Sequence, residues 1–264
     1  MLSFDSQAHW AASKGLKKGD VVSIYMENKP EYIITWLGLA KIGVTSALIN
    51  TNLTGKGLVH CIKISDAKLL IFGHESAQIV NDSRDLIESE YKKLEYFSYG
   101  GAVPFAQHLN PLLLEHSPQP PPRSVRKNLK SEDNWAFVYT SGTTGLPKAA
   151  IITHHRYFLA SYSFAILFDV TKKDRVYLAL PLYHSAGGII GLGMLLHSNA
   201  LLVIRKKFSA TKFITDGLSL LFIYFFFRKF KISRLIRKNS EGTQVHSGAV
   251  HWRALQVHSR HATE

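Results

Sequence analysis

Near the middle of the chain stands the stretch Tyr139-Thr140-Ser141-Gly142-Thr143-Thr144-Gly145-Leu146-Pro147-Lys148, between the apolar runs 135–139 and 149–152. Its two glycines let the backbone bend and bring N–H groups close to an anion. The Ser and Thr hydroxyls add neutral donors, and Lys148 supplies a mobile positive charge. The stretch therefore predicts a phosphate-binding loop held between two strands.

Two other interpretations of this stretch are a Walker-type loop and a plain turn. The spacing does not fit the Walker pattern G-x-x-x-x-G-K-[ST], because Lys148 lies three residues after Gly145 and Ala149 follows it. A Ser/Thr/Gly turn between two strands, without any ligand, is the plain alternative. Lys148 and the segments further along the chain favour the phosphate loop over that turn.

Three segments resemble one family of enzymes. The loop is similar to the phosphate-loop signature of the adenylate-forming enzymes, which include acyl-CoA synthetases and luciferases. A closer resemblance, to the fatty acid transport proteins (the very-long-chain acyl-CoA synthetases), is carried by Tyr139 to His155, by Pro181-Leu182-Tyr183-His184-Ser185-Ala186-Gly187 and by Arg205 to Ala210. The resemblance runs from about Ser6 to Phe213.

The resemblance implies a long-chain or very-long-chain fatty acid–CoA ligase that works through an acyl-adenylate and supports fatty acid uptake. It implies ATP/AMP, Mg²⁺ and coenzyme A as cofactors or co-substrates. The candidate catalytic residues are Lys148 and His184; a lone histidine is more often structural, but the family motif around His184 favours a site role. The cofactor-binding candidates are Tyr139, Thr140, Ser141, Gly142, Thr143, Thr144, Gly145, Leu146, Pro147 and Lys148. No metal ligand is assigned.

Several family segments have no counterpart after Phe213, including those for the ribose, for adenine with Mg²⁺, and for the C-terminal lysine. The sequence also begins late relative to the family, so we expect an incomplete form, truncated at both ends, with no measurable acyl-CoA formation. Two other functions remain open: a non-catalytic nucleotide- or acyl-binding fragment that could associate with full-length relatives, and a basic membrane-surface module.

The charge is strongly positive and unevenly distributed. The 264 residues carry a net charge of +13 and are 46% hydrophobic. Residues 217–264 hold eight Lys and Arg against two acids, which leaves 24 against 17 for residues 1–216. A moderately basic body suits ATP, coenzyme A, fatty carboxylates and a membrane surface. No nucleic-acid partner is expected, because no recognisable motif accompanies the charge. The single Cys61 is expected to be a small buried side chain rather than a disulfide or metal ligand.

Strand and helix patterns alternate along residues 15–215. β-type runs occur at 21–25, 44–49, 68–72, 135–139, 149–152, 174–180 and 200–204, and helical patterns at 30–42, 53–64, within 75–96 and at 154–168. This alternation predicts an α/β fold with a mostly parallel sheet and flanking helices, as expected for part of the large N-terminal domain of an adenylate-forming enzyme. The proline-rich segment 117–122 is interpreted as a stiff loop within that domain.

The domain boundary is placed at residue 216. Residues 1–216 are assigned to a partial AMP-binding domain and residues 217–264 to a divergent, irregular basic tail, either disordered or membrane-interfacial. The apolar residues 218–227 are too few to cross a bilayer as a helix, which takes about 20. By family, we expect a membrane-associated protein at the cytosolic face of the endoplasmic reticulum or plasma membrane.

Overall fold

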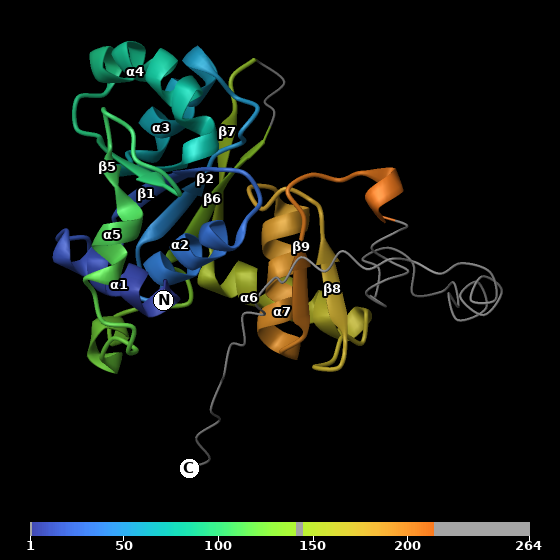
Figure 1. The fold of residues 1–264 in the computed structure, drawn as a ribbon. Coiled ribbons are helices and arrows are strands. Elements are labelled where there is room, and N and C mark those ends of the chain that lie inside the picture. Colours follow the sequence, from blue (N-terminus) through green and yellow to red (C-terminus); the bar gives the residue numbers. More distant parts are fainter. Residues whose placement is uncertain (1, 141–144, 214–264) are drawn as a thin grey trace.

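The computed structural model describes residues 2–140 and 145–213 (Figure 1). Its strands are β1 (Val21–Tyr25), β2 (Thr45–Leu48), β3 (Leu69–Gly73), β4 (Glu95–Tyr99), β5 (Gln107–His108), β6 (Asn134–Thr140), β7 (Lys148–Thr153), β8 (Arg175–Leu178) and β9 (Leu201–Ile204). The α-helices are α1 (Phe4–Ser13), α2 (Pro30–Ala40), α3 (Gly55–Ser65), α4 (Ala77–Glu90), α5 (Leu109–Leu114), α6 (His154–Leu167) and α7 (Leu192–Ser198). Shorter turns are the 3₁₀ helices η1 (His74–Ser76) and η2 (Arg123–Arg126) and the π-helix η3 (Ser185–Gly191).

Seven strands form one sheet in the order β5-β4-β3-β1-β2-β6-β7. All neighbours pair in parallel except β6 and β7, which form an antiparallel hairpin. The chain passes from β1 to β2 on one side and then returns to β3 on the other side of β1. Because parallel crossovers are right-handed, α2 and α3 lie on opposite faces of the sheet. This confirms the mostly parallel sheet with flanking helices.

The central strands are buried on both faces, which explains their nearly continuous apolar sequences. In β1, Val22 and Ile24 pack in a core shared with α1, α2 and α5, whereas Tyr25 packs on the opposite side with residues of α3 and α4. The two-residue period of a strand thus sends alternate side chains into two cores. Figure 1 shows these helices on either side of the sheet.

The start and the end of α2 follow from the sequence. Pro30 stands at the first helical position, where its missing N–H costs no hydrogen bond. The chain leaves the helix at Gly43, whose φ of +77° favours glycine. The helix predicted at 30–42 is confirmed, and Thr45 then enters β2 beside β1.

Two expectations about the sheet were wrong. Strand β4 (Glu95–Tyr99) was not predicted, because the helical pattern within 75–96 was the one element assigned there, although Phe97, Ser98 and Tyr99 are completely buried. In addition, β8 and β9 do not extend the large sheet but form a separate parallel pair, packed on one face by α6 and α7. A single sheet from residue 15 to residue 215 is therefore incorrect. Residues 210–213 are helical, and the tail assigned to residues 217–264 lies outside the described residues.

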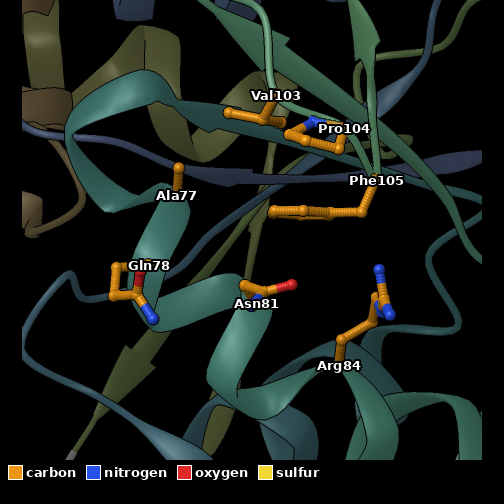
Figure 2. Close-up of a pocket in the computed structure, with 7 residues that line it drawn as sticks. All are labelled: Ala77, Gln78, Asn81, Arg84, Val103, Pro104 and Phe105. Carbon is orange, nitrogen blue, oxygen red and sulfur yellow. The ribbon is translucent and has the colours of Figure 1, made fainter.

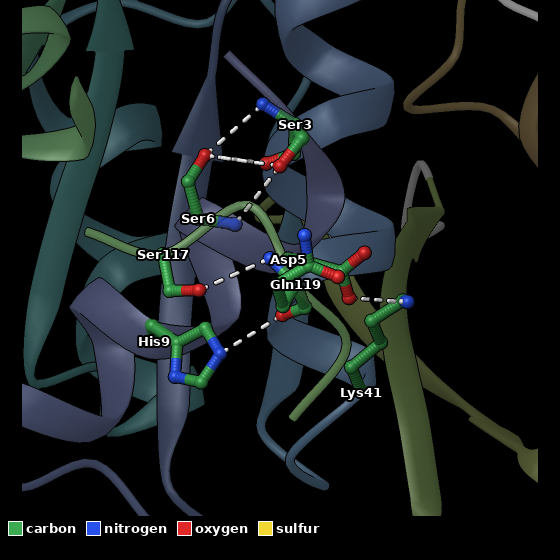
Figure 3. Close-up of polar contacts among 7 residues, drawn as sticks. All are labelled: Ser3, Asp5, Ser6, His9, Lys41, Ser117 and Gln119. Carbon is green, nitrogen blue, oxygen red and sulfur yellow. Dashed lines mark hydrogen bonds and ion pairs between the residues drawn. The ribbon is translucent and has the colours of Figure 1, made fainter. Parts of the chain in front are cut away.

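The proline-rich loop is tied to α1 (Figure 3). His9 Nε2 donates to the Gln119 carbonyl at 3.0 Å, and the Gln119 amide donates to Ser117 Oγ at 3.1 Å. The loop connects parts of one sheet, because β5 precedes it, β6 follows it, and both strands belong to the seven-stranded sheet. In the same view, Asp5 in the first turn of α1 pairs with Lys41, which follows α2, at 2.6 Å.

Candidate active site

The predicted phosphate loop is the connection of the β6–β7 hairpin. Thr140 pairs with Lys148 across the ladder, and Thr140 Oγ1 donates to the Lys148 carbonyl at 3.5 Å. Ser141, Gly142, Thr143 and Thr144 lie outside the described residues. The hairpin thus holds Thr140 and Lys148, the two residues that border the loop, opposite each other at one end of the sheet.

The described loop residues differ in what they can offer a ligand. Thr140 and Lys148 are exposed, and no described acid lies within ion-pair distance of the Lys148 ammonium. Gly145 has a φ of +107°, which a side chain would strain. Leu146 is 48% exposed, and the Pro147 carbonyl accepts from His60 Nε2 at 3.0 Å.

The Tyr139 side chain is directed away from the loop. Its hydroxyl donates to the Cys61 carbonyl in α3 at 2.7 Å, and burial raises the pKa of this phenol well above its ordinary value. The phenol thus anchors β6 on α3, and only the backbone of Tyr139 remains available to a ligand.

His184 begins the π-helix that follows β8. Its Nδ1 accepts from the Ala186 amide at 3.2 Å, so that the neutral ring carries its hydrogen on Nε2. The His184 side chain is exposed. The ring is therefore oriented by its own turn and presents Nε2–H as a donor to whatever occupies the space in front of it.

Glycines let this π-helix pack closely on the turn before it. A Cβ on Gly187 would lie 2.2 Å from the Pro181 carbonyl oxygen, and one on Gly188 would lie 2.3 Å from that of Leu182. The Gly188 carbonyl in turn accepts from the hydroxyl of Tyr157 in α6 at 3.4 Å. π-helical segments are rare in proteins, but those that occur often lie at functional sites. Here the π-helix begins directly after His184 and holds that residue in place.

The fold brings the loop and His184 to one edge of the large sheet. Asn28, which follows β1, hydrogen-bonds the backbone on both sides of Pro181. Burial raises the pKa of Tyr183, and a hydrogen bond to Thr51, which follows β2, opposes that shift. The loop leaves β6, the next strand in the sheet. The carboxyl ends of parallel strands are the usual ligand-binding edge of such sheets.

Sequence reasoning missed Asn28 because no motif contains it. The available signal was its position between the first strand and Pro30, at the carboxyl end of a central parallel strand. The aromatic cluster behind the π-helix was missed as well. Trp36 lies 5.8 Å from Tyr157 and 6.2 Å from Trp135, measured between ring centroids.

A shallow hollow of about 350 Å³ lies elsewhere (Figure 2). It is formed by α4 and the segment before β5, where the guanidinium of Arg84 lies 5.5 Å from the centre of the Phe105 ring. Its lining is Ala77, Gln78, Asn81, Arg84, Val103, Pro104 and Phe105. Because β5 and the β6–β7 hairpin stand at opposite ends of the strand order, the hollow contributes nothing to the site of the loop and His184.

Residues 2–140 and 145–213 contain neither a cluster of metal-ligating side chains nor a helix suited to span a membrane. No group of three or more His, Cys, Asp or Glu side chains there could hold a metal ion. No helix in the same part of the chain combines the length and the apolar character needed to span a membrane.

The comparisons with known proteins agree with this geometry. The model of the AMP-binding enzyme family matches residues 4–219, and the chain therefore belongs to this family. It is 43% identical over 204 residues to long-chain fatty acid transport protein 1 of Bos taurus, covering 76% of this chain and 31% of that protein. The human counterpart is 42% identical over the same shares. The chain thus spans about a third of the length of these relatives.

Solved structures with the same fold include proteins described as CoA ligases. The inhibitor-bound N-terminal domain of FACL13 from Mycobacterium tuberculosis superposes with a TM-score of 0.71 at 25% identity, over 82% of this chain and 51% of that one. The anthranilate CoA ligase AuaEII, in complex with anthranoyl-AMP, gives a TM-score of 0.73 at 18% identity, over 82% of this chain and 41% of that one, which supports the fold alone. The resemblance inferred from the motifs is confirmed at the level of the family.

Proposed function

We propose that this chain carries part of the adenylation site of a fatty acid–CoA ligase of the fatty acid transport protein type, acting on long-chain or very-long-chain fatty acids and supporting their uptake. The observation that carries the proposal is that the β6–β7 loop and the turn of His184 meet the same carboxyl edge of the sheet. The similarity to fatty acid transport proteins supports the acyl substrate.

The proposed reaction has two steps. A carboxylate oxygen of the fatty acid attacks the α-phosphorus of ATP, and the bond to the bridging oxygen breaks to release pyrophosphate. The thiol of coenzyme A then attacks the acyl carbonyl, which gives the thioester and AMP, while the thiol proton goes to solvent. The first step concentrates charge on phosphate oxygens, so fixed donors and a cation near them supply positioning and electrostatic stabilisation.

Each residue has a distinct proposed role. Lys148, exposed at the end of the hairpin, would neutralise phosphate charge, and the Thr140 hydroxyl would turn from the Lys148 carbonyl to donate to a phosphate oxygen. Gly145, Leu146 and Pro147 would shape the loop, and Tyr139 would contribute only backbone. Ser141, Gly142, Thr143 and Thr144 are assigned as donors from the sequence. His184 would donate from Nε2 to the acyl-phosphate side of the site.

Mg²⁺ is assigned to the nucleotide in this proposal. Mg²⁺ keeps several waters and commonly binds substrate phosphates with one or two carboxylates. The part of the chain that the structure describes offers no cluster of metal-ligating side chains, so we assign no protein site to the ion.

A second candidate is a binding fragment that holds nucleotide or acyl groups without turnover. The observation favouring it is that Lys148 is exposed at the end of the loop, where it can hold a phosphate whether or not turnover follows. We propose residues 1–216 as the partial AMP-binding domain and residues 217–264 as a basic tail. Association with full-length relatives and with the cytosolic face of the endoplasmic reticulum or plasma membrane is proposed for this chain from its family.

The test begins with ATP binding, measured by titration calorimetry on the purified chain. ATP–pyrophosphate exchange is then followed with and without oleate. Exchange stimulated by oleate would support the ligase, whereas ATP binding without exchange would support the binding fragment. Absence of ATP binding would overturn the ligase and the nucleotide-binding fragment, and absence of oleate binding as well would overturn the acyl-binding fragment.

A further inference from the structure

Asn28 makes three long-range hydrogen bonds with its side chain. Its Nδ2 donates to the carbonyls of Leu180 at 2.8 Å and Arg205 at 3.2 Å, and its Oδ1 accepts from the Leu182 amide at 2.8 Å. Asn28 itself is 8% exposed. These bonds join the loop after β1 to the segments that follow β8 and β9, and thus join the two sheets.

The orientation of this amide follows from its partners. A rotated amide would place Oδ1 against two carbonyl oxygens and Nδ2 against a backbone N–H, so every bond would be lost. In a parallel sheet, one residue of a strand bonds the carbonyl of residue i and the amide of residue i+2 on its neighbour. The Asn28 side chain makes the same pair of bonds, to the Leu180 carbonyl and the Leu182 amide. The intervening Pro181 has no N–H to pair. The Asn28 side chain therefore replaces a strand at the end of β8.

The turn held by Asn28 leads directly to His184. The His184 amide donates to the Pro181 carbonyl at 3.1 Å, and the Gly188 amide donates to the His184 carbonyl at 2.8 Å. Each of these bonds has a partner within the turn or the π-helix. The bonds from Asn28 to Leu180 and Leu182 differ, because they connect the turn to the large sheet through a nearly buried side chain.

Ion pairs beside Asn28 also join the segment after β1 to the segment after β9, but they constrain the backbone less. Glu27 pairs with Lys206 at 2.5 Å, but that lysine side chain is 64% exposed. Exposed pairs contribute little to stability and do not fix a backbone position. A buried amide with three bonds defines both distance and direction, because each unmade bond would leave a buried polar group unpaired.

We propose that Asn28 is a positioning residue, which sets the place of the Leu180–Leu182 backbone and thereby of His184 relative to the β6–β7 loop. Its meaning for catalysis rests on the proposed function, whereas the positioning itself does not. Asn28 acts on the acyl-phosphate side of the site and leaves the loop itself unchanged.

The experiment compares the parent chain with Asn28→Ala and with Asn110→Ala. Asn110 is a matched control, because its Oδ1 accepts from the Gly100 amide at 2.7 Å in a turn far from His184 in the sequence. Amide hydrogen exchange is followed by NMR at Leu182, Gly188, Gly100 and Ile71. Asn28→Ala should speed exchange at Leu182 at least tenfold and leave Ile71 unchanged, whereas Asn110→Ala should speed exchange only at Gly100.

Binding provides the second measurement. In Asn28→Ala, affinity for a non-hydrolysable oleoyl-adenylate analogue should fall at least tenfold, while affinity for ATP stays within twofold of the parent. A merely structural role would weaken both ligands alike. Asn28→Asp keeps the acceptor for Leu182 but sets a carboxylate against two carbonyls, so it should protect Leu182 better than Asn28→Ala does and still weaken the analogue.

The outcomes separate the two proposals. Unchanged exchange at Leu182 in Asn28→Ala would overturn the positioning role, as would equal acceleration at Ile71. Faster exchange with unchanged analogue affinity would overturn its link to the site. If the parent binds neither ligand, the proposed function fails, and the exchange data alone decide whether Asn28 holds the turn.

Discussion

Replacing Gly188 by alanine tests the close packing that fixes the His184 segment. An added Cβ would lie 2.3 Å from the Leu182 carbonyl oxygen and 2.9 Å from the nearest atom of the Trp36 ring. Neither neighbour can rotate away easily, because one is backbone and Trp36 is completely buried. The π-helix would have to move by roughly 0.7 Å to restore even a 3.0 Å separation from that oxygen.

The expected cost follows from known overpacking. Extra methyl groups in a filled core destabilise by about 1–3 kcal/mol, and contact with backbone puts Gly188→Ala near the upper end. In a chain of this size, each kcal/mol lowers the melting temperature by about 2–4 °C. We therefore expect Gly188→Ala to melt about 6–12 °C below the parent, as measured by far-ultraviolet circular dichroism.

Gly57→Ala is the matched control, because Gly57 lies inside α3 and the nearest atom to its added Cβ is Leu53 Cδ2, at 3.3 Å. Leu53 can adjust, and alanine favours a helix interior over glycine by about 1 kcal/mol. Gly57→Ala should thus melt at or slightly above the parent. If Gly188→Ala melted within 2 °C of the parent, roughly the smallest effect of 1 kcal/mol, the packing argument would be refuted.

Three further outcomes are expected. Lys148→Ala should weaken ATP binding about 10- to 100-fold, since a hydrogen bond to a charged group contributes about 1.5–3 kcal/mol. Calorimetry should show no such loss in Lys127→Ala. Equal ATP affinities for Lys148→Ala and the parent would contradict the phosphate loop. Burial raises the pKa of the Cys61 thiol to about 12, so a thiol reagent at pH 8 should react slowly with the folded chain and rapidly in denaturant; equal rates would contradict that burial. Burial lowers the pKa of His197 below 6.5. The neutral imidazole therefore contributes stability above pH 6.5, which is lost as the pH falls through the folded pKa. Urea unfolding of His197→Asn should show a weaker loss of stability in that window, and a pH profile identical to that of the parent would contradict the lowered pKa.

The sequence by itself determined most of the local structure and the family. Apolar runs and helical periods located β1, α2, β2, α3, β3 and the β6–β7 hairpin within a few residues, because exposure of each side chain is set by the period of its own element. The loop from Tyr139 to Lys148 and the His184 motif identified the AMP-binding family, since both are continuous in the sequence and chemically specific.

Strand β4 shows where local signals fail. Its sequence, Glu-Tyr-Phe-Ser-Tyr, follows Lys92-Lys93-Leu94 and resembles a surface segment. Phe97 is buried only because α1 and α5 cover that end of the sheet, where Trp10 lies 4.9 Å from it between ring centroids. The separation of β8 and β9 from the large sheet likewise depends on strand order, which residue periodicity does not encode.

Only the tertiary structure decided how the candidate site is assembled. Asn28 and Leu182 are 154 residues apart, yet one hydrogen bond between them helps bring the His184 turn to the edge where the β6–β7 loop begins. Such a contact exists only after the sheet has ordered its strands. The physical reason is that the sequence specifies which groups can pair, whereas the packing of the two sheets specifies which of them meet.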